Sequence, residues 1–341
     1  MNTHDSYLPR RGFLQAGLSL AAAWPLASVG GREIHGQQNP SPASLSVPCV
    51  NCQTDLTALL KPSVCLFSKH LGWIEDYERL AAQTAEIGFD GVDLAVRPGG
   101  HVLPENVERD LPRAAESMNR AGLKISMITT KITNPRDPNT RRILKTAALL
   151  GIRYYRRDGL PWSQSTNPLE QIAELGPDLR ELAAMNKKYG MFSGIHNHSG
   201  YDLGATPWEI YEMVKKLHPE QMGSNFDIAH ATVEGGIGGW RSGFRLLAVE
   251  KRIRMLAIKD FFWQKVEGRW EPQWCPLGQG MVDFKTFFSY LQEIQFAGPM
   301  SMHFEYPNAG DTEEEKKASL IKDMKKDLGI LRGFLKEAGL A

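Results

Sequence analysis

The sequence has little net charge and few cysteines. Its 40 lysines and arginines nearly balance 39 aspartates and glutamates, which leaves a formal net charge of +1 at pH 7 over 341 residues. A chain so close to neutral has no long-range attraction for nucleic acid or for an anionic membrane, and we expect neither as a partner. Of the four cysteines, Cys49 and Cys52 form a CxxC pair. This pair lacks the second pair of a zinc site and the βαβ unit of a redox motif, so a local disulfide or two idle thiols is favoured.

Long apolar runs and nucleotide-binding motifs are scarce as well. Beyond the N-terminal segment, no run is long and apolar enough to suggest a membrane span in the mature protein. The glycine-rich run GGIGG at 235–239 has no Lys-Ser/Thr continuation and so does not open a nucleotide motif.

The N-terminal segment resembles an export signal of the twin-arginine type. In LPRRGFLQAGLSLAAAWPLASVGG, Arg10 and Arg11 precede Phe13 and Leu14 and a weakly apolar run that ends in small residues. This run is too short and too rich in small residues for a membrane span. We therefore predict a signal peptide over 1–30, a flexible leader rich in proline, serine and glutamine over 31–61, and a periplasmic or extracytoplasmic mature protein.

Strand-like and helix-like segments alternate after the leader. Apolar runs typical of strands cover 63–67, 91–96, 124–129, 152–156, 191–196, 223–228, 253–259 and 300–305. Stretches with helical spacing include 73–87, 105–121, 140–150 and 168–189. Alternation of this kind implies parallel strands, and eight repeats in about 250 residues favour a closed barrel over an open sheet. We predict one (β/α)₈ TIM barrel over 62–341.

Ionisable side chains gather where three of the predicted strands end. They are His196 and His198 on the fifth strand, Asp227 and His230 on and after the sixth, and His303 and Glu305 on the eighth. The C-terminal ends of the strands of a β/α barrel meet at one face, where catalytic residues collect. His196 and His198 could both ligate a metal, or one could orient the other through a hydrogen bond. His303 is expected one layer lower in the barrel, where a structural role is favoured.

Six segments carry a resemblance to a known family. They are SVCLFSKHLGW, GFDGVDLAVRPGGHVLPENVERDLP, FDIAHATVEGG, IKDFFW, PLGQGMVDF and GPMSMHFEY. In order and spacing they resemble the xylose isomerase-like TIM-barrel superfamily of sugar-phosphate isomerases and epimerases, and within it the exported branch. The resemblance covers about 62–340. It implies the barrel but leaves the reaction open, because a barrel of this kind hosts many chemistries.

The resemblance also implies a metal site. The superfamily's usual site is one divalent metal held by a glutamate on the fifth strand, an aspartate on the sixth, a histidine on the seventh and a glutamate on the eighth. Asp227 and Glu305 match two of these positions, and His230 matches a histidine that contacts substrate. His196 stands in place of the glutamate, and Ala257 in place of the seventh-strand histidine. We therefore expect one divalent ion (Mn, Zn, Co or Mg) on His196, Asp227 and Glu305.

The remaining assignments concern catalysis and substrate binding. Lys259 shares the strand parity of Ala257, so it can reach the space that the missing histidine would fill. We expect Glu305 to be the acid or base, with His230 and Lys259 as its catalytic partners. The expected substrate-binding residues are Arg156, His198, His101 and Trp263.

Aromatic residues in the predicted loops favour a carbohydrate-sized pocket, since indole faces pack on the C–H faces of sugar rings. They are Trp162, Trp240, Phe261, Phe262, Trp263, Trp270 and Trp274.

We predict an isomerase or epimerase that acts on a carbohydrate or polyol by metal-assisted proton transfer next to a carbonyl. One of the two facing carboxylates of a two-sided epimerase is missing, so a lyase or hydrolase of an oxidised sugar stays open. So does a non-catalytic periplasmic sugar-binding barrel that has lost the metal. Separately, Asp227 and Glu305 could be buried acids paired with Lys259 or Arg156. The expected partner is a small-molecule carbohydrate, and the sequence leaves a homo-oligomer open.

Overall fold

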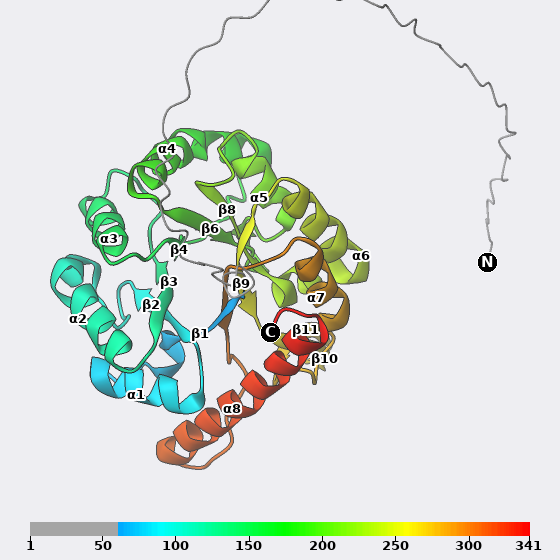
Figure 1. The fold of residues 1–341 in the computed structure, drawn as a ribbon. Helices are drawn as coiled ribbons and strands as arrows, with labels where there is room; N and C mark the ends of the chain where they lie inside the picture. The colour runs from blue at the N-terminus through cyan, green and yellow to red at the C-terminus, as the bar shows by residue number, and fades with distance from the viewer. Residues whose placement is uncertain (1–60) are drawn as a thin grey trace, which may run out of the picture. The chain divides into compact units, whose positions relative to one another are not determined.

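The structure, a computed structural model, describes residues 61–341. The predicted signal peptide and the leader up to residue 60 lie outside the described residues. Eight parallel strands close into a barrel in the order β1-β12-β9-β8-β6-β4-β3-β2 (Figure 1). They are β1 (Ser63–Phe67), β2 (Gly91–Val96), β3 (Lys124–Thr130), β4 (Tyr154–Arg156), β6 (Phe192–His196), β8 (Met222–Asp227), β9 (Ile253–Ile258) and β12 (Pro299–Met302). The predicted (β/α)₈ TIM barrel is confirmed.

Helices surround the barrel on the outside (Figure 1). They are α1 (Tyr77–Ile87), α2 (Val107–Arg120), α3 (Pro138–Leu149), α4 (Pro168–Tyr189), α5 (Pro207–Val214), α6 (Ile228–Val249), α7 (Phe284–Glu293) and α8 (Glu313–Glu337), with the short 3₁₀ turns η2 (Ser68–Leu71) and η3 (Pro104–Asn106). The four helices predicted by range are confirmed, with ends that move by up to four residues. Among the described residues, no helix combines the length and the apolar character needed to cross a membrane.

The barrel interior has an apolar floor. Cys65, Met127, Phe192 and Met255, from four different strands, pack together there. Successive side chains of a strand alternate between its two faces, so residues two positions apart share a face. The column that begins at Phe192 therefore reaches His196, and the column that begins at Met255 continues through Ala257. The residues of this floor therefore indicate which side chains of the same strands point into the barrel near its C-terminal mouth.

A hairpin follows β9 directly. Strands β10 (Asp260–Val266) and β11 (Arg269–Cys275) pair antiparallel, joined by a turn at Glu267 and Gly268 with φ of 47° and 85°. Positive φ at both central residues is typical of a type I′ turn, whose twist suits two paired strands. At the base of the hairpin, the buried Asp260 carboxylate accepts four backbone N–H groups, from Phe261, Gly278, Gly280 and Val282. A second small sheet pairs β5 (Leu160–Pro161) with β7 (Asp202–Leu203).

Two sequence expectations change in the structure. Trp240, expected in a loop, lies in α6 and is buried against Phe287 and Tyr290, because α6 continues past a kink at Gly236. The last barrel strand ends at Met302 rather than at Glu305, which lies three residues further along the chain.

Candidate active site

Asp227 organises the end of β8 and the start of α6. It is the N-cap of α6, and its Oδ1 accepts the backbone N–H of His230 at 2.9 Å. Capping satisfies an N–H group that the first helical turn leaves free, and it also fixes the orientation of the carboxylate. The Asn197 side chain donates to the Asp227 carbonyl and accepts its N–H, both at 2.8 Å. The ends of β6 and β8 are therefore locked together.

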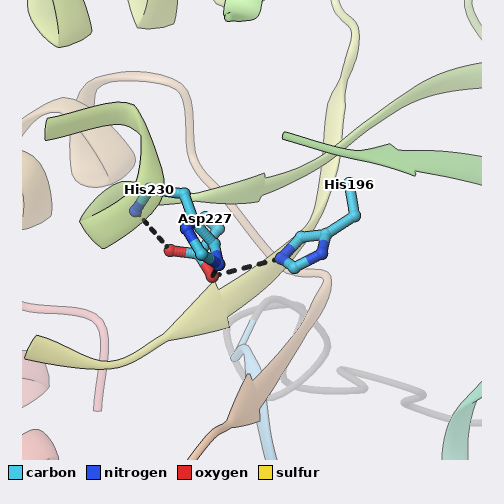
Figure 2. Close-up of side chains that lie close together, drawn as sticks. All are labelled: His196, Asp227 and His230. Atoms are coloured by element: carbon cyan, nitrogen blue, oxygen red, sulfur yellow. Dashed lines mark hydrogen bonds and ion pairs between the residues drawn. The ribbon is translucent and has the colours of Figure 1, made fainter. Parts of the chain in front are cut away.

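Three potential ligands meet at this point. The second carboxylate oxygen of Asp227, Oδ2, lies 3.1 Å from His196 Nε2 (Figure 2). Asp227, His196 and His230 are all buried, and each offers a donor atom within 4.8 Å of the others. Imidazole nitrogen and carboxylate oxygen are donors that Zn, Mn or Co accept. Of the predicted ligands His196, Asp227 and Glu305, the structure brings the first two together in this group, with His230 and not Glu305 as the third member.

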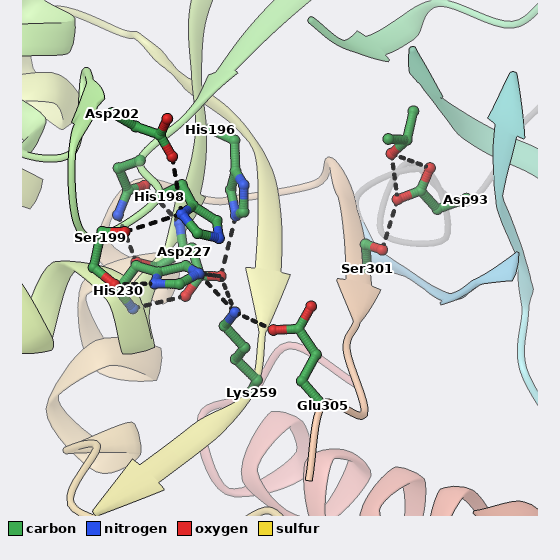
Figure 3. Close-up of polar contacts among 12 residues, drawn as sticks. Asp93, His196, His198, Ser199, Asp202, Asp227, His230, Lys259, Ser301 and Glu305 are labelled. Atoms are coloured by element: carbon green, nitrogen blue, oxygen red, sulfur yellow. Dashed lines mark hydrogen bonds and ion pairs between the residues drawn. The ribbon is translucent and has the colours of Figure 1, made fainter. Parts of the chain in front are cut away.

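Lys259 extends into the middle of this group. Its Nζ lies 2.7 Å from His230 Nε2, 2.6 Å from Glu305 Oε2 and 3.7 Å from Asp227 Oδ2 (Figure 3). The Trp274 ring covers the ammonium, with 4.0 Å between Nζ and the ring centroid. The ring face favours a cation. The lysine side chain is only 3% exposed, so its charge is neutralised by neighbouring side chains rather than by water.

Glu305 is held by two lysines. One carboxylate oxygen accepts from Lys259 and the other from Lys69, which belongs to η2 after the first strand. Burial acts to raise the pKa of Glu305, but the Lys259 ammonium, aided by Lys69, lowers the pKa well below its usual range. Glu305 is therefore ionised. Its side chain is 23% exposed, whereas that of Asp227 is fully buried, so Glu305 is the more accessible of the two carboxylates.

The neighbouring histidines are neutral. Burial lowers the pKa of His196, His230 and His303 well below the usual value. Because Lys259 can only donate, His230 Nε2 accepts from it, and the proton lies on Nδ1, which contacts Ser199 Oγ at 2.7 Å. Nδ1 of His196 and both ring nitrogens of His303 find no hydrogen-bond partner within residues 61–341.

The predicted substrate-binding residues are spread over the mouth. His198 lies beyond the end of β6, where the chain turns, so it does not share the strand face of His196. It pairs with Asp202 at 3.1 Å, and its ring centroid lies 4.3 Å from that of His230. Arg156 ends β4 and is half-buried; burial lowers its pKa, and nearby Asp93 opposes this shift.

His101 and Trp263 lie further out. His101 lines a cavity of about 400 Å³ together with Arg97 and Lys69, and Lys69 also contacts Glu305. Trp263 lies on β10, is 37% exposed and packs edge-on against Phe261 at 5.9 Å. The indole that reaches the centre is that of Trp274, on the partner strand of the hairpin.

Several contributors were not assigned from the sequence. Asn197 and Ser199 follow the fifth strand in HNHSG, where their position after a strand end was the available signal. Trp274 was grouped with the loop aromatics, and only the hairpin brings it to Lys259. A separate polar group surrounds Asp93, which accepts from Thr129 and Ser301 and lies apart from Lys259 (Figure 3). Burial raises the pKa of Asp93 to about 6, against the lowering effect of these two hydroxyls.

Comparison with known proteins identifies the family. Residues 81–327 match the family model of the xylose isomerase-like TIM barrel. The chain belongs to this family.

Solved structures share the fold of this xylose isomerase-like chain at low identity. A D-tagatose 3-epimerase-like protein is 20% identical with a TM-score of 0.61, over 81% of this chain and 98% of that one. An L-ribulose 3-epimerase is 18% identical with a TM-score of 0.60, over 81% and 95%. The 3-keto-D-glucoside 4-epimerase of E. coli is 13% identical with a TM-score of 0.59, over 80% and 100%. At these identities the likeness concerns the fold.

A sequence relative is the uncharacterized protein MJ1311 of Methanocaldococcus jannaschii. It is 25% identical over 127 residues, which are 36% of this chain. The match spans 40% of the length of that relative.

In this xylose isomerase-like site, the Lys259 ammonium occupies the space of the divalent ion that the family resemblance implies. The donor types of His196, Asp227 and His230 suit such an ion, but metal–ligand bonds are about 2.0–2.2 Å long. An ion bonded to His230 Nε2 and Asp227 would lie against the Lys259 ammonium, which is 2.7 Å from that nitrogen. Ala257, opposite Asp227 in the strand register, offers no ligand. The residues do not fit a divalent ion while Lys259 holds this position.

Proposed function

We propose that the protein is an isomerase or epimerase that transfers a proton next to the carbonyl group of a sugar or polyol derivative. The observation that carries this proposal is the Lys259 ammonium fixed between the neutral His230 and the ionised Glu305 at the mouth of the barrel. The fold is shared with proteins named as 3-epimerases and a 4-epimerase of sugars, which supports the substrate class.

The reaction requires a base and a positive charge close together. When a base removes the proton next to a carbonyl, the C–H electron pair forms the new carbon–carbon double bond and the carbonyl oxygen becomes negative. A fixed ammonium group stabilises this oxygen in the transition state. We assign this role to Lys259 and the role of base to Glu305. Return of the proton from Glu305 to the former carbonyl carbon, with transfer of the hydroxyl proton to the other oxygen, gives the isomer, whereas the epimer requires a proton from a second donor on the opposite face.

The basicity of Glu305 depends on its two lysine contacts. With both in place, the low pKa makes the carboxylate a weak base. A substrate oxygen that accepts a hydrogen bond from the Lys259 ammonium weakens the contact between Lys259 and Glu305. Burial then raises the pKa of Glu305 with less opposition from Lys259. A carboxylate with a higher pKa is a stronger base. His230, whose ring is oriented by Ser199, holds the lysine in place throughout.

Substrate hydroxyls are assigned to residues around the centre. His198 and Arg156 approach it from the ends of the fifth and fourth barrel strands, and we propose that they bind hydroxyl groups. His101 and Trp263 are assigned to the outer part of the substrate. His196, Asp227 and Glu305 have the donor types for a divalent ion, but no step of the proposed reaction passes through one, because Lys259 supplies the charge.

A second candidate is elimination or hydrolysis of an oxidised sugar. The observation that favours it is the unequal exposure of the two carboxylates, since Glu305 is 23% exposed and Asp227 is fully buried. One accessible carboxylate suits proton removal from one face, which is also the first step of a β-elimination.

The test is incorporation of solvent deuterium into D-tagatose, D-allulose, D-fructose, L-ribulose and a 3-keto-D-glucoside, followed by mass spectrometry and product analysis. We expect native protein to exchange at least one of these sugars and Glu305→Gln to be slower by roughly 10²–10⁴. Glu78→Gln, on the exposed face of α1, is the control and should behave as native. Exchange that persists in Glu305→Gln excludes the assigned base, an unsaturated product identifies the lyase, and binding without exchange identifies a sugar-binding barrel.

We also propose that the protein is exported through the twin-arginine route to the periplasm. Arg10 and Arg11 support this proposal, and they lie outside the described residues.

A further inference from the structure

The Lys259 ammonium is surrounded much as a metal ion would be. One imidazole nitrogen and two carboxylate oxygens face Nζ at 2.7, 2.6 and 3.7 Å, and the Trp274 ring closes another side. His196 stands behind Asp227 at 3.1 Å. We infer that Lys259 is a built-in replacement for a divalent ion, and that His196, Asp227, His230 and Glu305 are a latent metal site which this lysine keeps closed. The inference rests on the proposed function for its chemical meaning, but it is tested by metal binding alone.

The charge balance makes the lysine and an ion mutually exclusive. Asp227 and Glu305 carry two negative charges, and Lys259 and Lys69 carry two positive charges that offset them. A divalent ion added to both lysines would leave two excess positive charges in a buried cluster. Like charges at such short range in a poorly solvated site repel strongly. An ion can therefore enter only where the Lys259 ammonium has left.

The local backbone explains how the lysine reaches this point. Ala257 pairs with Asp227 in the parallel register of β8 and β9. Its methyl group leaves space beside the carboxylate, and Lys259, two residues on and on the same face, extends into that space. Position 257, which could carry a metal ligand, is thus an alanine. The next residue on the same face, Lys259, supplies a cation instead.

The experiment is a titration with Co²⁺, whose visible absorption reports its coordination, together with calorimetry and elemental analysis. Native protein should show no bound Co²⁺ at this site. Lys259→Ala removes the ammonium and leaves the four donors, so it should bind a single Co²⁺ with an affinity higher by roughly 100-fold or more. Lys259→Ala combined with Ala257→His adds an imidazole ligand and should bind more tightly still.

Two controls fix the location of the site. Lys69→Ala frees the same Glu305 carboxylate but keeps the Lys259 ammonium, so it should not bind Co²⁺. Lys259→Ala combined with Asp227→Asn loses a ligand and should lose the binding that Lys259→Ala creates. Circular dichroism verifies that each variant is folded.

Either of two results overturns the inference. The first is a native protein that binds a single Co²⁺ as tightly as Lys259→Ala does. The second is a folded Lys259→Ala variant that binds none. If Lys259→Ala does not fold, the native protein provides the test. Deuterium exchange that a chelator abolishes and Co²⁺ restores would refute the inference that Lys259 replaces a divalent ion. Absence of exchange with every sugar would refute the proposed function while leaving the Co²⁺ results to judge the latent site.

Discussion

A buried neutral histidine should make the stability of this barrel depend on pH, and His70 allows the effect to be measured. His70 lies in η2, is 9% exposed, and its Nε2 accepts the backbone N–H of Phe304 at 3.0 Å. That bond requires an unprotonated nitrogen. Burial, with the nearby Lys69 ammonium, lowers the pKa of His70 to about 3.

The sign and the size of the pH effect on the free energy of unfolding follow from the pKa of His70 in the folded and unfolded states. The pKa is lower in the folded state than the value of about 6.5 in the unfolded chain, so below pH 6.5 the unfolded chain binds the extra proton. The contribution of His70 to stability is complete above pH 6.5 and is lost as the pH falls toward about 3. Between pH 7.5 and pH 5.5, this one residue should lower the free energy of unfolding by about 1.4 kcal/mol.

The assay is urea unfolding at pH 7.5 and pH 5.5 for native protein and His70→Gln. Glutamine can accept from the Phe304 N–H but does not titrate, so the decrease between the two pH values should be smaller by about 1.4 kcal/mol in the variant. His218→Gln is the control, because it makes the same substitution at an exposed histidine, and it should show the native decrease. An equal decrease in native protein and His70→Gln would refute the reasoning, since His70 would then not resist protonation in the fold.

Two more predictions concern Asp227 and the N-terminal arginines. Asp227→Asn keeps an equally good N-cap for α6 but removes the charge beside Lys259, so deuterium exchange should fall at least roughly tenfold while the free energy of unfolding falls by about 1–3 kcal/mol. Parallel exchange and urea measurements check this, and a variant with full exchange and a large loss of stability would mark Asp227 as structural. Changing Arg10 and Arg11 to Lys should keep the precursor in the cytoplasm, because export of this type depends on the paired guanidinium groups. Cell fractionation with immunoblotting checks this, and unchanged periplasmic recovery would contradict the predicted signal.

The parts of the site that follow from local patterns were predictable. Strand alternation placed Lys259 on the face of Ala257, and the spacing of Asp227 and His230 is that of an N-cap and the third residue of the helix it caps. Both patterns act within a few residues, so the sequence contains all the information they need.

Contacts between distant segments were not predictable in the same way. Lys69 meets Glu305 because the first and last strands pair to close the barrel, across 236 residues of sequence. Trp274 reaches Lys259 only because the register of the β10–β11 hairpin sets it opposite Phe261. Hydrophobic periodicity predicts the strands but not which side chains of distant segments meet, and it also gave no sign that α6 would continue through GGIGG and bury Trp240.

The four backbone N–H groups bound by Asp260 fasten the chain where it leaves the barrel and where it returns. The Glu267–Gly268 tip lies at the opposite end of the hairpin from this anchor, so we expect changes in its length or side chains to leave the barrel closed. Trp274, near the base of the hairpin, lies over Lys259, while the more exposed Trp263 and Trp270 lie nearer the tip. We therefore expect substitutions near the tip of the hairpin to change which substrates enter the barrel without changing the residues around Lys259.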